Sequence, residues 1–271
     1  MINLRSLVIA VCTIGAAINL KGFSSSKLFL PVRDEAYEAN NSIEASKQKR
    51  TVHVLYGLSG ADSGFFSEFE ISLKSVLMNS PLDSNLKVHI MADQEAYTAL
   101  ADSFERTQIA TWTTRNQVTV ETYNVQSNVK KWVQVIKEYL PSVGHHTVGA
   151  FFRLFVQDVV ESSVDHVLYL DTDVVVTAHL DSLWDYADKN YIFTYGELRC
   201  SGFVILTVAR LNELWEIARK FDLVKISHTT KESIGDQLIL KAINASYPEL
   251  VGFSPKNGMS HWQMIVCGLD S

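Results

Sequence analysis

The sequence is poor in the residues that staple small proteins or join several domains. Three cysteines in 271 residues are too few for a disulfide scaffold or a cysteine-rich zinc module. With 13 glycines and 5 prolines there is little linker material, which favours one main folded domain. Hydrophobic residues make up 47% of the chain and charged residues 20%, a composition that can fill a core and excludes a disordered protein.

Basic residues are also scarce over most of the chain. The net charge is −6. Residues 1–50 carry seven basic and four acidic side chains, or +3, which leaves −9 for residues 51–271. An acidic body repels phosphate chains unless a metal or a local basic group intervenes, so we expect no nucleic-acid partner.

The N-terminal 22 residues predict targeting to the secretory pathway. Arg5 precedes an apolar stretch from Leu7 to Leu20, which is shorter than the roughly 20 residues that span a bilayer comfortably. The stretch fits a signal peptide, cleaved near the small residues 15–17, or a short uncleaved signal anchor that attaches the chain to the membrane. We expect a type II membrane protein of the Golgi or ER lumen in the second case and a secreted protein in the first.

Residues 23–50 lack a sustained period and are predicted to be a stem, with the folded domain at 51–271. Asn40 and Asn244 begin N-glycosylation sequons, which carry meaning only in that pathway.

The folded pattern begins as strand, loop, helix, strand. Residues 51–56 are rich in β-branched and aromatic residues, and residues 57–60 form a loop. Ser67 and Glu70 have capping-box spacing for a helix that stops at 79–81, and 86–91 is the next strand. This order predicts a βαβ unit of a parallel sheet, with ligands at the carboxyl ends of the strands. There is no GxGxxG or Walker sequence, so this loop alone does not identify a nucleotide site.

The segment 151–176 carries the strongest chemical signal. An apolar helix face is expected from Phe151 onward, with Arg153 and Gln157 on the opposite face. The buried strand 167–170 then delivers Asp171 and Asp173, whose side chains point to the same side if the strand persists. Two such carboxylates repel each other, and a hard divalent cation offsets the repulsion. The alternative is a solvated polar strand end or an Asx-capped turn.

Two later segments are less specific. Ser201 and Gly202 precede an apolar strand that ends at Thr207, and Gly202 permits close backbone approach to a ligand or is an ordinary turn glycine. Asp236 and Gln237 stand before another apolar run. Asp236 also suits a helix N-terminus for dipole reasons alone. Between these segments, 211–220 is an amphipathic scaffold helix.

Taken in order, these pieces resemble glycosyltransferase family 8, the retaining sugar transferases of GT-A fold. The motifs that carry the resemblance, from about Thr51 to about Trp262, are Arg153-Leu154, VLYLDTDVVV at 167–176, His179-Leu-Asp-Ser-Leu-Trp184, Ser201-Gly202 and Gly235-Asp236-Gln237. The end of the chain looks closest to the glucoside and xyloside xylosyltransferase branch. The resemblance implies a single catalytic α/β domain with a Rossmann-like mixed, mainly parallel sheet flanked by helices.

The resemblance also implies an activity and a set of roles. A sugar, with xylose favoured and glucose or galactose possible, would pass from a UDP-sugar to a glycan or glycoprotein acceptor. Asp171 and Asp173 would hold Mn²⁺ (or Mg²⁺), with Asp171 also near the ribose or sugar, and Arg153 would place positive charge near the phosphates or donor sugar. The other donor-site positions would be Tyr56, Gly57 and Leu58 for uracil and ribose, Cys200, Ser201 and Gly202, and Asp236 and Gln237 along the donor sugar, with Gln237 nearest the reacting carbon.

The sequence departs from the family at three points. Cys200 stands where the family usually has a sugar-contacting Asn, and Leu238 stands where Asp is commoner. The late His-x-x-Gly-x-x-Lys-Pro-Trp segment, which supplies a third metal ligand and a phosphate-binding Lys, is missing. His261 is the candidate replacement ligand, or a core or surface histidine.

These departures keep two alternatives open. One is a sugar-nucleotide-binding homologue without turnover. The other is a haloacid-dehalogenase-like phosphatase, because Asp171-Thr-Asp173-Val-Val175 fits its nucleophile loop and Gly235-Asp236 mimics its late acidic motif. That phosphatase needs the nucleophile near the start of the domain, whereas a long folded stretch precedes Asp171.

Overall fold

The computed structural model describes residues 49–81, 84–116, 118–139, 148–195, 201–230, 235–253 and 265–266. All of them lie in one compact unit, Lys49–Ser271. The predictions made for residues 1–48, for Cys200 and for His261 lie outside the described residues. Among the helices that are described, none is long and apolar enough to cross a membrane.

Strands and helices alternate along the first half of the unit, as the βαβ pattern predicts. The strands are β1 (Thr51–Leu58), β2 (Asn85–Ala92), β3 (Val118–Asn124), β4 (His166–Leu170), β5 (Val174–Val175), β6 (Phe193–Tyr195), β7 (Phe203–Thr207), β8 (Val251–Phe253) and β9 (Ile265–Val266). The α-helices are α2 (Ser63–Met78), α3 (Gln94–Thr107), α4 (Ile109–Asn116), α5 (Gln126–Tyr139), α6 (Val148–Phe151), α7 (Leu211–Ala218), α8 (Leu223–Thr230) and α9 (Asp236–Ser246). Short 3₁₀ helices are η3 (Phe152–Asp158), η4 (Leu180–Tyr186), η5 (Val208–Arg210) and η6 (Pro248–Leu250).

The main sheet has the predicted mixed, mainly parallel character. Its seven strands follow the order β3-β2-β1-β4-β7-β6-β8. Strands β3, β2, β1 and β4 run parallel, whereas β7 runs antiparallel to both of its neighbours, β4 and β6. Because β7 is reversed, it begins where β4 ends: Leu170 pairs with Phe203, and the Asp171 N–H donates to the Gly202 carbonyl at 2.9 Å. Residues that precede β7 are thereby placed beside residues that follow β4.

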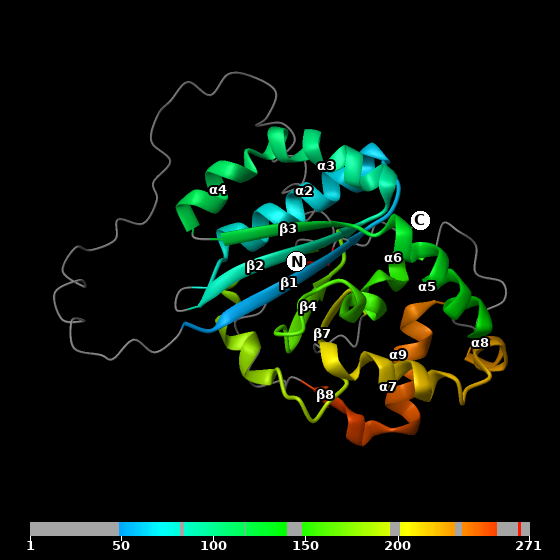
Figure 1. Cartoon of the computed structure of the whole chain (residues 1–271). Coiled ribbons are helices and arrows are strands. Elements are labelled where there is room, and N and C mark those ends of the chain that lie inside the picture. Colours follow the sequence, from blue (N-terminus) through cyan, green and yellow to red (C-terminus); the bar gives the residue numbers. More distant parts are fainter. Residues whose placement is uncertain are drawn as a thin grey trace, which may run out of the picture. The chain divides into compact units, whose positions relative to one another are not determined.

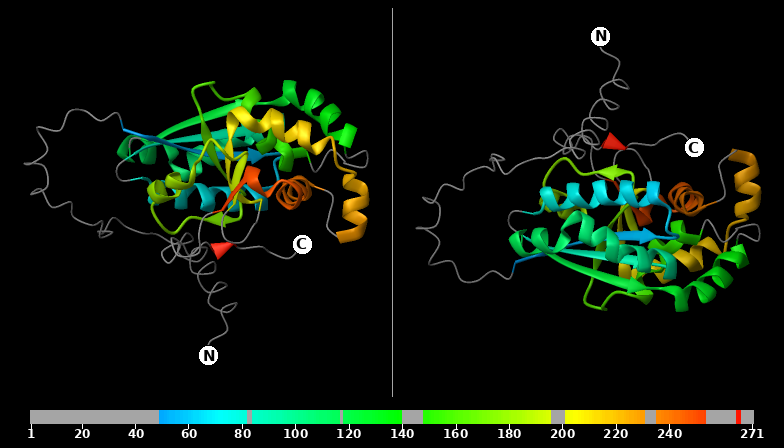
Figure 2. Two further views of the ribbon diagram at one scale, coloured as in Figure 1. Left: turned by 90° about the horizontal axis from the view of Figure 1, so that it is seen from below. Right: turned by 90° about the horizontal axis from the view of Figure 1, so that it is seen from above.

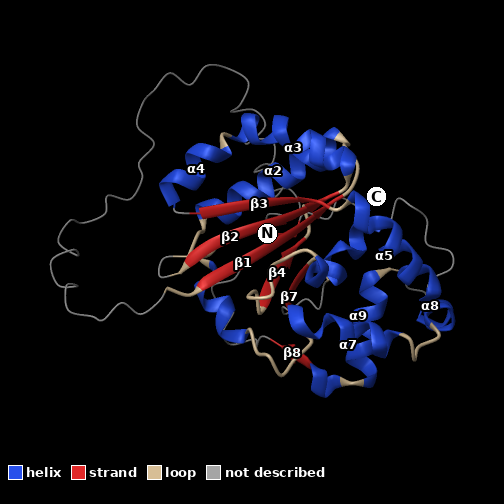
Figure 3. Ribbon diagram, viewed as in Figure 1, coloured by secondary structure: helices blue, strands red, loops and turns tan. Residues whose placement is uncertain are grey.

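Helices cover both faces of the sheet (Figure 1 and Figure 3). The period of two along β1 sends Val52 and Val54 into one core with α2, α3 and α4, and sends Leu55 into a second core on the other face. The second core contains α5, α6, η3, α7 and α9. Helix α8 lies at the outer edge of this unit, against α9 (Figure 2). The observed layers confirm the predicted α/β class.

The predicted capping box of the first helix is wrong. Helix α2 begins at Ser63, where the Asp62 carboxylate accepts the N–H groups of Gly64 (2.9 Å) and Phe65 (3.1 Å). Ser67 lies inside the helix, and its hydroxyl donates to the Ser63 carbonyl. Aspartate is as good an N-cap as serine, so the box spacing of Ser67 and Glu70 competed with an equally good signal at Asp62, five residues before Ser67.

The segment that carries Arg153 also differs from the expected amphipathic helix. It consists of α6 followed by the tighter 3₁₀ helix η3, and both have buried residues on several sides. Arg153 is only 3% exposed, so it does not occupy a solvent-facing side opposite the apolar residues. Strand β1 continues through Leu58, so Gly57 and Leu58 belong to the strand rather than to a loop.

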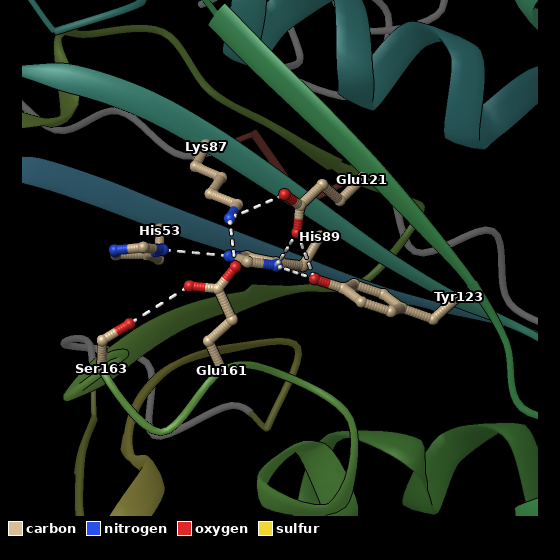
Figure 4. A network of polar contacts seen from close by, with 7 residues as sticks. All are labelled: His53, Lys87, His89, Glu121, Tyr123, Glu161 and Ser163. Carbon is tan, nitrogen blue, oxygen red and sulfur yellow. Dashed lines mark hydrogen bonds and ion pairs between the residues drawn. The ribbon is translucent and has the colours of Figure 1, made fainter.

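A chain of polar contacts crosses β1, β2 and β3 on the face opposite α2 (Figure 4). Tyr123 donates to Glu121 Oε2 at 2.5 Å, so its oxygen accepts from His89 Nδ1 at 2.9 Å. His89 Nε2 is 2.9 Å from His53 Nδ1, and in the neutral form of His89 that has its proton on Nδ1 it accepts from His53. Lys87 closes the network on Glu121 at 2.7 Å. Burial, followed by the charges of His53 and Lys87, lowers the pKa of His89 and favours its neutral form.

Removing the Asp62 side chain, the observed N-cap, should destabilise the unit more than removing the hydroxyl of Ser67, the predicted N-cap. We expect Asp62→Ala to lower the free energy of unfolding by about 1 kcal/mol, because two N–H groups at the start of α2 lose their acceptor. Ser67→Ala, the matched control, should change it by less than about half of that. Denaturant titration measures both variants. Equal losses in the two would contradict the observed helix start.

Stability should fall as the pH drops from 6.5 toward 4. Burial is the main cause that lowers the pKa of His89 from 6.5 to about 4, and the charges of His53 and Lys87 add to it. Between these values the unfolded chain binds the proton and the folded chain does not, so acid favours unfolding by at most about 3 kcal/mol.

The His89→Gln variant should show a shallower fall of the unfolding free energy over this window than the wild type. The control His228→Gln removes an exposed histidine on α8 and should keep the wild-type slope. Denaturant titrations at a series of pH values measure the three slopes. The same slope in His89→Gln as in the wild type would show that this network does not couple stability to pH.

Candidate active site

The carboxyl end of β4 is acidic and partly shielded from water. Strand β4 ends at Leu170, and Asp171 to Asp173 form a turn in which the Val174 N–H donates to the Asp171 carbonyl at 3.2 Å. The strand bonding therefore reaches Asp171 but not Asp173, and alternation does not set the direction of Asp173 relative to Asp171. Loss of water, followed by the charge of Asp171, raises the pKa of Asp173. Partial burial of Glu68 on α2, followed by the charges of Asp173 and Asp62, raises the pKa of Glu68. Such a site favours a bound cation.

Arg153 is the buried cation beside these acids. Its Nη2 donates to Asp171 Oδ1 at 2.9 Å, and its Nε lies 3.4 Å from Asp236 Oδ2. Its other donors go to main-chain oxygens, Nε to Ala150 at 2.9 Å and Nη1 to Ser201. The guanidinium carbon also lies 3.7 Å from the centre of the Tyr169 ring. One side chain thus interacts with two carboxylates that come from distant parts of the sequence.

The two oxygens of Asp171 have different surroundings. Oδ1 accepts from both Arg153 and the Tyr169 hydroxyl, the latter at 2.7 Å. Oδ2 lies against Gly202, where a Cβ atom would be only 2.4 Å from it. The close approach expected at Gly202 is therefore to Asp171 itself. Glycine is required there because any side chain would displace this carboxylate.

Asp236 and Gln237 stand at the first turn of α9, as the sequence predicts. Asp236 is 6% exposed, and burial is the main cause that raises its pKa, while Arg153 opposes the rise. The Gln237 N–H and the Ser201 hydroxyl also stabilise its charged form. Gln237 is half-buried beside it. Arg153 therefore ties the start of α9 to the end of β4.

Of the three residues predicted to receive the uracil and ribose, Tyr56 and Leu58 have their side chains in the core. Tyr56 is fully buried, with its hydroxyl 2.9 Å from Ser72 Oγ on α2, and Leu58 is also fully buried. Gly57 faces the other side of the sheet, toward Gly149 and Phe152. Tyr56 and Leu58 can offer a ligand main-chain groups but not their side chains.

The sequence analysis did not predict two side chains of the candidate site, those of Tyr169 and Glu68. Tyr169 was expected only as a strand residue, although the period of two places it on the same side as Asp171. Glu68 was missed because nothing in the sequence shows that its helix passes close to Asp173. The main-chain oxygens of Ala150 and Ser201 carry no sequence signal at all.

The oxygen groups at this end of β4 fit a hard divalent cation as part of its ligand set. Within the described part of the chain, no group of three or more His, Cys, Asp or Glu side chains is arranged to hold a metal ion. Mg²⁺-type sites often use one or two carboxylates and complete the shell with substrate phosphates and water. Asp171 Oδ2 and Asp173 suit that arrangement.

The fold and this strand end define the class as GT-A-like α/β proteins of the glycosyltransferase type. The structure is similar to the apo form of mouse Xyloside xylosyltransferase 1, with a TM-score of 0.60 and 12% identity over 75% of this chain and 85% of that one. The family model "Glycosyl transferase family 8" matches residues 58–229, more than half of the chain. The chain therefore belongs to glycosyl transferase family 8.

Curated relatives agree with this assignment. Glycosyltransferase GlyF of Streptococcus pneumoniae serotype 4 is 32% identical over 133 residues, which is 40% of this chain and 31% of that protein. Probable galacturonosyltransferase-like 4 of Arabidopsis thaliana is 21% identical over 185 residues, 66% of this chain and 47% of that protein. The chain thus spans about a third and about half of the lengths of these relatives. The family favours a transferase over the phosphatase interpretation of residues 171–175.

Replacing Gly202 by alanine should be costly. We expect Gly202→Ala to lower the free energy of unfolding by about 1–3 kcal/mol, because the new methyl group collides with Asp171 Oδ2 in a packed site. Gly235→Ala is the steric control, because a Cβ there meets nothing within 4 Å. Denaturant titration compares the two. If both were tolerated equally, Asp171 would not lie against Gly202 as described.

Proposed function

We propose that the chain is a retaining glycosyltransferase that moves a sugar from a UDP-sugar to a glycan or glycoprotein acceptor, with Mn²⁺ or Mg²⁺ at Asp171 and Asp173. One observation carries the proposal: Asp171, pinned on Oδ1 by Arg153 and Tyr169, presents Oδ2 at the carboxyl edge of the sheet, two residues before a second aspartate. Family membership supports transfer of a sugar.

The charges of the site suit an anionic donor only when a cation is bound with it. Arg153 is already engaged by Asp171 and Asp236, so its charge is balanced by the protein. Asp173 and Glu68 are additional negative charges nearby. A diphosphate would be repelled by this set, and a cation bound with it removes the repulsion and stabilises the leaving diphosphate.

In this proposal, different residues of the chain bind the cation, the donor sugar and the nucleoside. Asp171 Oδ2 and Asp173 hold the cation, and Asp236 and Gln237 line the donor sugar at the start of α9, with Gln237 nearest the reacting carbon. Arg153 links Asp171 to Asp236. Main-chain groups of 56–58 receive the uracil and ribose, since the Tyr56 and Leu58 side chains are in the core.

Xylose is the donor sugar that we propose first, with glucose and galactose next. The end of the sequence resembles the xylosyltransferase branch, and the structure shares its fold with a xyloside xylosyltransferase. The fold alone does not select a sugar, so the test uses a panel of donors.

The test is UDP release by the full chain from UDP-xylose, UDP-glucose and UDP-galactose, with and without Mn²⁺. We expect metal-dependent release from at least one donor. Asp173→Ala should slow it by roughly 100-fold or more, because charge stabilisation at the diphosphate is lost. Asp102→Ala, an exposed aspartate on α3, is the matched control and should leave the rate unchanged.

The same samples distinguish an active transferase from a sugar-nucleotide-binding protein without turnover. Calorimetry with UDP and Mn²⁺ measures binding independently of turnover. Binding without release from any donor would replace the proposal by a sugar-nucleotide-binding protein without activity. If neither binding nor release occurs, the UDP-sugar proposal is wrong.

A further inference from the structure

Tyr169 is the last but one residue of β4 and shares a side of the strand with Asp171. It is 3% exposed, and its hydroxyl lies 2.7 Å from Asp171 Oδ1. Its ring lies under the Arg153 guanidinium at 3.7 Å. A tyrosine buried in this way contacts both Asp171, which follows the strand, and Arg153 of η3, and is itself shielded from solvent.

The Tyr169 hydroxyl helps to set the orientation of the Asp171 carboxylate. Arg153 alone gives one hydrogen bond to Oδ1, and Arg153 also interacts with Asp236, so it does not fix Asp171 by itself. The Tyr169 hydroxyl adds a second donor to the same oxygen. With Oδ1 satisfied twice, Oδ2 is the oxygen left for a ligand, on the side where Gly202 has no Cβ.

We propose that Tyr169 is a positioning residue that holds Asp171 so that Oδ2 is turned toward the metal and diphosphate of the donor. The inference rests on the proposed function and adds a residue that touches neither metal nor sugar. It follows that removing one phenol oxygen weakens metal-dependent binding, although every metal ligand is still in place. A carboxylate that must first be oriented binds more weakly than one that is already held.

The test compares Tyr169→Phe with a matched control, Tyr123→Phe, in the full chain. In both residues a phenol donates to a carboxylate two positions away in the sequence, to Asp171 in one and to Glu121 in the other. Tyr123 is on β3, which β2 and β1 separate from β4 (Figure 4). Both substitutions keep the aromatic ring and remove only the hydroxyl.

Calorimetric titration of Mn²⁺ in the presence of UDP is the main readout, with thermal unfolding as the second. We expect Tyr169→Phe to weaken the apparent Mn²⁺ affinity by about tenfold, as expected for one lost hydrogen bond to a charged group. Binding should be recovered at higher Mn²⁺ concentration, and Tyr123→Phe should bind Mn²⁺ with wild-type affinity. A purely structural role of Tyr169 would change the unfolding temperature without changing the Mn²⁺ dependence.

Two other outcomes overturn the inference in different ways. If the wild type and both variants bind Mn²⁺ and UDP equally well, Tyr169 does not position Asp171, and the proposed function stands. If the wild type binds no Mn²⁺ with UDP, the proposed function fails and takes this inference with it.

Discussion

The buried guanidinium of Arg153 is the interaction on which the rest of the structure depends. It lies between two carboxylates, Asp171 and Asp236, over an aromatic ring and against two main-chain oxygens. Breaking one side of such a buried pair typically costs about 3–5 kcal/mol, because an unpaired charge is left without water. These contacts join η3, the end of β4, the residues before β7 and the start of α9. The core on this face and the candidate site therefore form one connected unit.

The reversed direction of β7 makes this arrangement possible. Parallel strands alone would bring only their carboxyl ends to this edge of the sheet. Because β7 runs the other way, its first residues lie directly beside Asp171, and Gly202 can meet the carboxylate at a distance that excludes a side chain. The strand order also leaves the His53–His89 network on the other half of the sheet, on β1 to β3. The histidine network, with its Lys87–Glu121 ion pair, thus lies apart from the candidate site.

Local patterns predicted the fold well because they depend on neighbours in sequence. The β-branched run at 51–56, the buried run at 167–170 and the amphipathic run at 211–220 all form the expected elements. Asp171 was placed correctly at the end of β4 for the same reason. The start of α2 was misassigned because Asp62 and Ser67 offer similar local caps, and the choice is made by how the chain leaves β1.

The site was predicted less completely because its contacts join distant segments. Arg153 was expected opposite an apolar face, yet it is buried, since the acids that attract it come from β4 and α9. Tyr56 matches a donor-binding position in sequence, but its side chain enters the core because the strand alternates. The importance of Tyr169 follows from a hydrogen bond that strand periodicity permits but does not require.

We infer that Arg153 organises the acidic groups of the site instead of binding the donor itself. The most direct measurement is a crystal structure of the protein with UDP and Mn²⁺. We expect a metal ion on Asp171 Oδ2 and Asp173, with Arg153 still bonded to Asp171 Oδ1 and beside Asp236. A structure in which Arg153 has left both aspartates to bind the phosphates, or in which UDP occupies another edge of the sheet, would contradict it.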